Sequence, residues 1–126
     1  MTLKNIIRQT LLKGENLVDL LSTAFYGNSW FSCEVDDKWK YLIKSSSECR
    51  EDKWADVLKG GGKITVVDWE DDKSRHDISL DDIVKGLEKL YDEHLHVYAR
   101  AIENDGDFYD ADAVIQYAVY GEWVYG

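Results

Sequence analysis

The sequence predicts one α+β domain spanning residues 1–126, in which a small antiparallel sheet packs against about five to six helices. Three observations predict this class. Apolar residues recur at helical spacing toward both ends of the chain, and the middle carries a run rich in β-branched residues. The 126 residues, 44% of them hydrophobic and 32% charged, are typical of one folded domain.

Two helices are expected at the start of the chain. Thr2 is a candidate N-cap for a helix over residues 2–13, and a second apolar stripe begins at Leu17 and ends at Gly27. The residues expected to share the buried face of the first helix are Leu3, Ile6, Ile7 and Leu11.

A short β region follows. A turn is expected at residues 27–29, a strand at 30–35 and a returning strand at 39–43. Three serines then offer an N-cap to a helix near residues 48–58, which the glycine run at 60–62 ends.

The clearest strand covers residues 63–69, where Ile, Thr and Val favour a pleated conformation. A polar turn over residues 70–74 leads to a short strand at 75–78. Ser79 then caps the strongest helix, over residues 79–91, with Asp82 placed for a capping box. The apolar stripe of that helix is Leu80, Ile83, Val84, Leu87 and Leu90.

Two more helices complete the prediction. Leu95, Tyr98 and Ile102 continue at helical spacing after a bend, and a loop over residues 104–107 follows. The last helix opens at Asp110 or Asp112 and runs through Tyr120. It is apolar nearly all round, which predicts burial in the middle of the fold, above all for Val114, Ile115 and Ala118.

The acidic residues concentrate in one stretch. Residues 1–67 carry ten Lys or Arg and nine Asp or Glu, whereas residues 68–112 carry five and fifteen. The net charge of −10 excludes a free-standing cationic nucleic-acid binder, because phosphate neutralisation supplies most of such affinity. Either a solvated face or a surface for a basic partner explains the stretch. The candidate partner-binding residues are Asp68, Glu70, Asp71, Asp72, Asp77, Asp81, Asp82, Glu103, Asp105, Asp107, Asp110 and Asp112.

No motif indicates catalysis or metal binding. The chain has neither a Gly-x-Ser-x-Gly elbow nor a His-Glu-x-x-His helix, and the glycine run at 60–62 lacks the spacing of a phosphate loop. The cysteines and histidines lack the close pair that zinc modules supply. We therefore expect no catalytic residue, no metal and no cofactor, and a non-enzymatic protein is favoured.

Aromatic residues support an alternative. With five Trp and eight Tyr the chain is rich in them. Those inside apolar patterns, and therefore expected in the core, are Trp30, Trp54 and Trp69. The candidates for stacking on a small ligand such as a signalling nucleotide are Trp39, Trp123 and Tyr125. The cations available for its phosphates are Lys38, Lys40, Lys44, Arg50 and Lys53.

Four segments of the chain resemble small acidic proteins carried by bacteriophages and other bacterial mobile elements. They are residues 26–33 (YGNSWFSC), 61–71 (GGKITVVDWED), 78–87 (ISLDDIVKGL) and 118–126 (AVYGEWVYG). The resemblance spans most of the chain from Tyr26 onward. It implies a setting in the cytoplasm of a bacterial host, where phage cargo of this size often acts against host defence.

Charge and resemblance together give the expected function. We expect a non-enzymatic inhibitor of the anti-CRISPR or anti-restriction type, which imitates DNA toward a basic, nucleic-acid-binding defence protein. Ten net charges match those on about 17 Å of duplex. No direct nucleic-acid partner and no membrane partner is expected, since no apolar run approaches the roughly 18 residues of a span. The alternatives are a nucleotide-binding protein and an immunity protein against a basic nuclease toxin.

Overall fold

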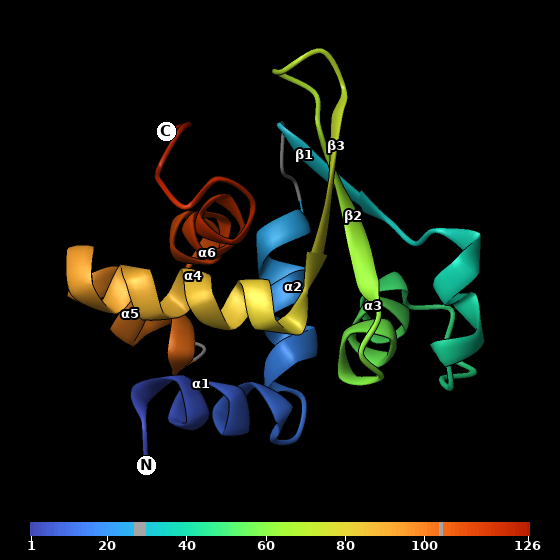
Figure 1. Ribbon diagram of the computed structural model, residues 1–126, viewed down its shortest axis with the longest axis horizontal. Helices are drawn as coiled ribbons and strands as arrows, with labels where there is room; N and C mark the ends of the chain where they lie inside the picture. The colour runs from blue at the N-terminus through green and yellow to red at the C-terminus, as the bar shows by residue number, and fades with distance from the viewer. Residues whose placement is uncertain (27–29, 104) are drawn as a thin grey trace.

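The structure, a computed structural model, describes residues 1–26, 30–103 and 105–126. Helices α1 and α2 come first, followed by strand β1, a 3-10 helix η1, helix α3, strands β2 and β3, and helices α4 to α6 (Figure 1). The bounds are α1 Leu3–Leu12, α2 Asn16–Phe25, β1 Phe31–Glu34, η1 Asp37–Leu42, α3 Arg50–Lys59, β2 Lys63–Asp68, β3 Ser74–Ser79, α4 Leu80–Glu93, α5 Leu95–Ile102 and α6 Phe108–Tyr120.

The three strands form one antiparallel sheet in the order β1-β2-β3, which confirms the α+β class. Side chains alternate between its faces. The face of β2 that meets the helices carries the buried residues Ile64, Val66 and Asp68. Trp69 is the next residue, and its side chain lies on the opposite face of the sheet. Helices α2, α3, α4 and α6 all contact the strands.

Helix α6 lies at the centre of the helical layer, in contact with α2, α4 and α5. Val114 and Ile115 are fully buried, as predicted, whereas Ala118 is half-buried. Four of the five residues in the predicted stripe of α4 are buried, and Leu80 at its start is half-buried. The predicted capping box is confirmed, because Ser79 Oγ accepts from the Asp82 amide and Asp82 Oδ2 accepts from the Ser79 amide.

Helices α4 and α6 pack closely at Gly86. A methyl group there would lie 2.9 Å from the backbone nitrogen of Ala118, which cannot move without shifting α6. We therefore expect Gly86→Ala to lower the free energy of unfolding by about 1–3 kcal/mol in urea denaturation, through overpacking. A gain of about 1 kcal/mol, the ordinary effect of Gly-to-Ala in an exposed helix, would show that the two helices are not in this contact.

Several sequence predictions were wrong in detail. Residues 39–43 are not a strand, because Asp36 caps the 3-10 helix η1 by accepting from the Lys38 amide. Helix α6 begins at Phe108, earlier than predicted, because Asp107 forms its cap. Ile6, placed on the buried face of α1, is 45% exposed. The turn predicted at residues 27–29 and position 104 of the predicted loop lie outside the described residues.

No helix in the described part of the chain is both long enough and apolar enough to cross a membrane.

Candidate functional site

The β2–β3 hairpin ends in a turn with an uncommon backbone. The Ser74 amide donates to the Asp71 carbonyl at 2.9 Å, and the two residues between them have positive φ, 53° at Asp72 and 61° at Lys73. Hairpin turns of this kind usually place Gly or Asn at such positions, because a side chain in the left-handed region costs about 1–2 kcal/mol. Among the described residues, these are the two non-glycine positions with positive φ.

Residues 69–73 form what we call the acidic hairpin tip, which projects beyond the helices at the top of Figure 1. Trp69 is 50% exposed, and its Nε1 donates to Ser32 Oγ at 2.9 Å. The Lys73 ammonium lies 5.4 Å from the centre of the Trp69 ring. The carboxylates of Glu70, Asp71 and Asp72 are exposed beside it. The prediction that Trp69 belongs to the core is therefore wrong, because its position along β2 points it away from the helices.

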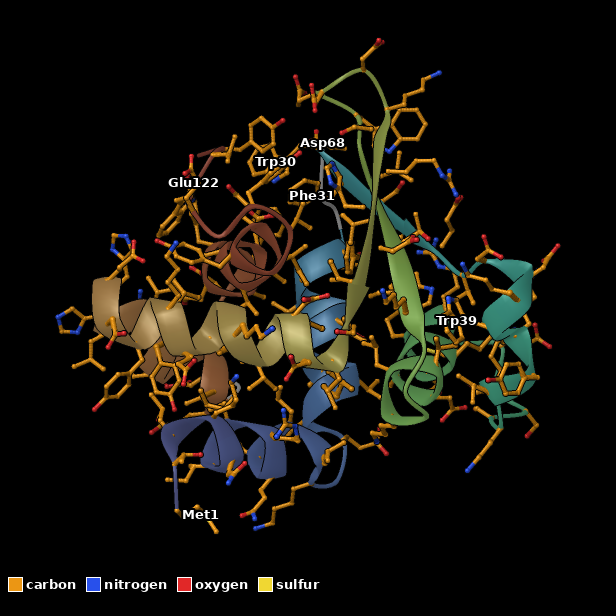
Figure 2. The ribbon with its side chains drawn as sticks, in the orientation of Figure 1. Met1, Trp30, Phe31, Trp39, Asp68 and Glu122 are labelled. Carbon is orange, nitrogen blue, oxygen red and sulfur yellow. The ribbon has the colours of Figure 1, made fainter. Side chains whose placement is uncertain are left out.

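Asp68 holds the tip from beneath (Figure 2). Its side chain is fully buried, and its Oδ1 accepts from the amides of Glu70 at 2.9 Å and Asp71 at 3.1 Å. Its Oδ2 accepts from the hydroxyls of Tyr120, at the end of α6, and Tyr125, at 2.6 Å. One carboxylate therefore joins the turn to the C-terminal segment through four hydrogen bonds.

The protonation states follow from these contacts. Burial alone raises the pKa of Asp68, but the hydrogen bonds from both tyrosines and both amides outweigh it and hold that pKa below its ordinary value. Burial and the bond to Asp68 raise the pKa of Tyr120 to about 12 and raise the pKa of Tyr125 as well. At neutral pH the cluster therefore contains one carboxylate and two protonated tyrosines.

His76 extends this cluster toward the turn. Its Nε2 lies 2.9 Å from Ser74 Oγ and 3.3 Å from Tyr120 Oη. Because Ser74 donates its proton to Asp71 and Tyr120 donates to Asp68, we infer that Nε2 carries a hydrogen and donates to both oxygens.

Three of the predicted partner-binding residues are buried and unavailable to a partner. Asp68 has the four internal donors described above. Asp110 accepts two bonds from Arg100, both 2.9 Å, and Asp112 accepts from Trp30 Nε1 at 2.9 Å and Gln116 Nε2 at 2.7 Å. These three predictions are corrected, because each carboxylate is satisfied inside the fold.

The remaining candidates do not gather on one face. Asp82 and Asp107 cap helices, Asp81 pairs with Arg8 at 2.7 Å, and Asp77 accepts from Thr65 at 2.6 Å. The connection between α5 and α6 lies away from the hairpin tip, next to α5 (Figure 1). The exposed acidic residues of this connection are Glu103, Asp105 and Asp107. The single acidic surface predicted over residues 68–112 is thus divided, and the hairpin tip is its densest exposed part.

The three aromatic candidates for ligand stacking do not converge. Tyr125 donates to Asp68, and its ring packs 5.9 Å from those of Trp30 and Phe31. Trp123 packs against His94, with ring centres 5.3 Å apart. Trp39 lies on η1, on the other side of the sheet from the C-terminal segment (Figure 2). The three residues therefore do not form one shared stacking site.

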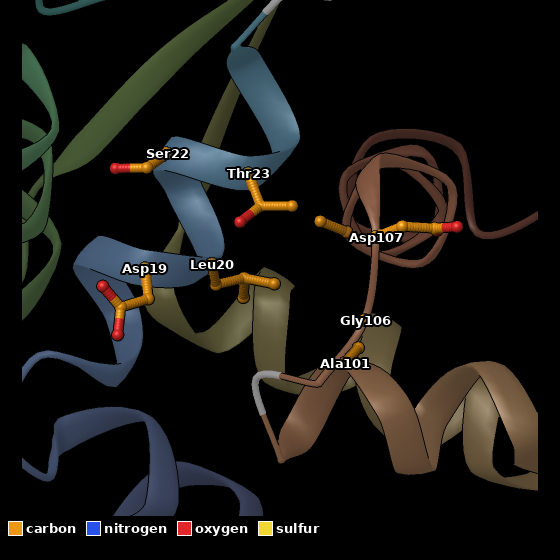
Figure 3. A pocket seen from close by; sticks show the side chains of 8 residues that line it. Asp19, Leu20, Ser22, Thr23, Ala101, Gly106 and Asp107 are labelled. Atoms are coloured by element: carbon orange, nitrogen blue, oxygen red, sulfur yellow. The ribbon is translucent and has the colours of Figure 1, made fainter.

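A cavity of about 260 Å³ lies between α2 and the start of α6 (Figure 3). The polar residues that line it are Asp19, Ser22, Thr23 and Asp107. None of the described residues that line it is basic, so the cavity does not suit a phosphate-bearing ligand.

No protein-family model, curated protein or solved structure matches the chain.

The sequence alone did not indicate two parts of this site. The turn contains no Gly or Asn, so nothing in it signals positive φ at Asp72 and Lys73. Tyr120 was assigned only to the end of a helix. Alternation along β2 places Trp69 on the face opposite Ile64 and Val66, but Thr65 and Val67 on that same face are buried, so alternation alone does not predict its exposure.

Proposed function

We propose that the protein is a non-enzymatic inhibitor that docks the acidic hairpin tip on a basic, nucleic-acid-binding partner. The observation that carries the proposal is a half-exposed tryptophan, Trp69, beside three exposed carboxylates on a turn that Asp68 fixes from within the fold.

The composition of the tip suits a basic protein surface. Carboxylates steer a positively charged partner during encounter, and net charge of −10 adds to that attraction. A tryptophan supplies large contact area with little loss of side-chain freedom, and such residues dominate binding energy at interfaces. Lys73 already lies over the Trp69 ring, which shows that the ring accepts a cation at this place.

The backbone of the tip supports a binding role. Two charged residues occupy left-handed positions that Gly or Asn would fill at lower cost, and such strain is typical of functional loops that their surroundings hold rigid. The bonds from Asp68 supply that rigidity. A turn fixed before binding loses less entropy when it docks than a free loop does.

The resemblance to phage and mobile-element proteins implies a bacterial host cell, and therefore a host defence protein as the partner. A defence protein that grips DNA or RNA presents Lys and Arg in a groove, and an acidic projection competes for them by charge. The anti-CRISPR and anti-restriction types of inhibitor share this physics, as does an immunity protein over a basic nuclease.

Capture from a bacterial lysate, first enriched for nucleic-acid-binding proteins on heparin, tests the proposal. Immobilised protein is expected to retain a partner at about 0.05 M salt and release it at about 0.5 M, as the screening length shortens. We expect Trp69→Ala to weaken retention at least tenfold, whereas Tyr41→Ala, at an exposed aromatic far from the tip, leaves it unchanged.

A charge-matched pair of variants separates the tip from overall charge. The variant with both Glu70→Gln and Asp72→Asn is expected to lose retention, and asparagine keeps the left-handed conformation accessible. The control with both Glu15→Gln and Glu48→Gln removes the same charge from exposed positions elsewhere. Equal losses in the two variants, or none in either, would refute a binding role for the tip.

A further inference from the structure

A second, larger cavity lies where β1, η1 and α3 meet, away from the hairpin tip. It has a volume of about 690 Å³, within the range of small-molecule sites. Its lining combines Lys40 of η1 with Arg50 and Lys53 of α3. We call it the basic cavity.

The charge of this cavity opposes that of the chain. Three cations line it beside one carboxylate, Glu34, and that carboxylate pairs with Arg75 across the sheet. Among the described residues, no carboxylate lies within 4.0 Å of the charged groups of Arg50 or Lys53. Lys40 pairs with Asp37 at 2.6 Å, but both are largely exposed, so the pair exchanges readily with another anion.

The cavity also has an apolar wall. Val35 and Ile43 are half-buried there, and burial raises the pKa of the Cys33 thiol, so the sulfur is neutral and adds no charge. Trp54 is only 4% exposed, because Phe25 packs on it at 5.3 Å and Arg50 lies over its ring at 5.5 Å. No ring face is thus free to stack a nucleobase, and the wall suits a compact apolar body.

We infer that the basic cavity binds a small organic dianion, a phosphate monoester or a dicarboxylate, whose charged head meets Lys40, Arg50 and Lys53 and whose apolar body meets Val35 and Ile43. The three cations come from two elements that line the cavity, and mutual repulsion among them is relieved when the dianion binds. The inference is independent of the proposed function, because the hairpin tip contributes no residue to this cavity.

Calorimetric titration with four probes tests the inference. Phenyl phosphate and phenylsuccinate carry the dianionic head and the body, inorganic phosphate carries the head alone, and phenol the body alone. We expect phenyl phosphate or phenylsuccinate to bind with Kd of about 1 mM or lower, and the two partial probes at least tenfold more weakly. Whichever of phenyl phosphate and phenylsuccinate has the lower Kd shows whether the cavity prefers a phosphate or a dicarboxylate.

Variants locate the binding. The double variant Arg50→Gln with Lys53→Gln is expected to weaken binding at least tenfold, and Lys40→Gln alone to weaken it severalfold. The control Lys59→Gln with Lys63→Gln removes the same charge from exposed positions of α3 and β2 outside the cavity, and should leave Kd unchanged. Circular dichroism and thermal midpoints confirm that each variant folds.

Three outcomes would overturn the inference. The first is that neither phenyl probe binds at about 1 mM. The second is that inorganic phosphate binds as tightly as phenyl phosphate, which would show an adventitious ion only. The third is that the Lys59 and Lys63 control loses as much affinity as the Arg50 and Lys53 variant.

Discussion

Replacing Asp68 with asparagine is expected to lower the free energy of unfolding by about 3 kcal/mol or more. Hydrogen bonds to a charged group are each worth about 1.5–3 kcal/mol, and Asp68 accepts four of them in a fully buried position. An asparagine presents one accepting oxygen and one NH₂ group, which only donates, so the NH₂ group faces either the two tyrosine hydroxyls or the two amides. Urea denaturation near neutral pH measures the loss.

The matched control is Asp77→Asn, at an exposed position with one bond to Thr65. It should cost no more than about 1.5 kcal/mol, the upper range for a single bond. If Asp68→Asn and Asp77→Asn are equally stable, the Asp68 cluster does not hold the turn.

The contribution of Asp68 also depends on pH. Its pKa in the folded protein is lowered, so its stabilisation is complete above the unfolded value of about 3.9 and is lost as pH falls through the folded value. Tyr120 acts in the opposite direction, because its folded pKa is raised to about 12. Its stabilisation is present below the unfolded value of about 10 and disappears as pH rises toward 12. The difference in free energy of unfolding between wild type and Asp68→Asn should therefore become smaller at low pH and at high pH.

Leu87→Ala is expected to cost about 2–5 kcal/mol, the range for removing a fully buried leucine from a packed core. Leu87 is 0% exposed on the face of α4 that packs against the other helices. Leu12→Ala in α1, where the side chain is 42% exposed, is the control and should cost much less. An unchanged denaturation midpoint for Leu87→Ala would mean that the stripe of α4 does not face the core.

Local patterns predicted the helices well and the strands in part. The cap at Ser79 and the stripe of α4 follow from spacing alone, because both depend on residues within four positions of one another. The sequence predicts a strand at residues 39–43, returning after a turn at residues 36–38. The side chain of Asp36 caps a 3-10 helix there instead, and strand propensity does not take such a cap into account.

The carboxylates show where sequence reasoning fails. A count of charges gives every carboxylate the same weight. Three of the counted carboxylates are buried, at Asp68, Asp110 and Asp112. Those of Asp71 and Asp72 are exposed. Asp112 is one of the two residues at which the sequence predicts that the buried last helix begins, so its place next to the core had a signal. Alternation along β2 places Asp68 on the same face as Ile64 and Val66, but no local pattern identifies its donors Tyr120 and Tyr125, which are more than fifty residues away in the chain.

The most direct test of the central claim uses the captured partner and a short labelled duplex DNA. Fluorescence anisotropy follows the duplex as the protein is added to the partner–DNA complex. The wild-type protein should release the duplex, and the variant with Glu70→Gln and Asp72→Asn should need at least tenfold more protein, about 1.4 kcal/mol in affinity. If the partner holds the duplex and the protein together, or if the variant releases the duplex as well as wild type does, the acidic hairpin tip does not compete for a nucleic-acid site.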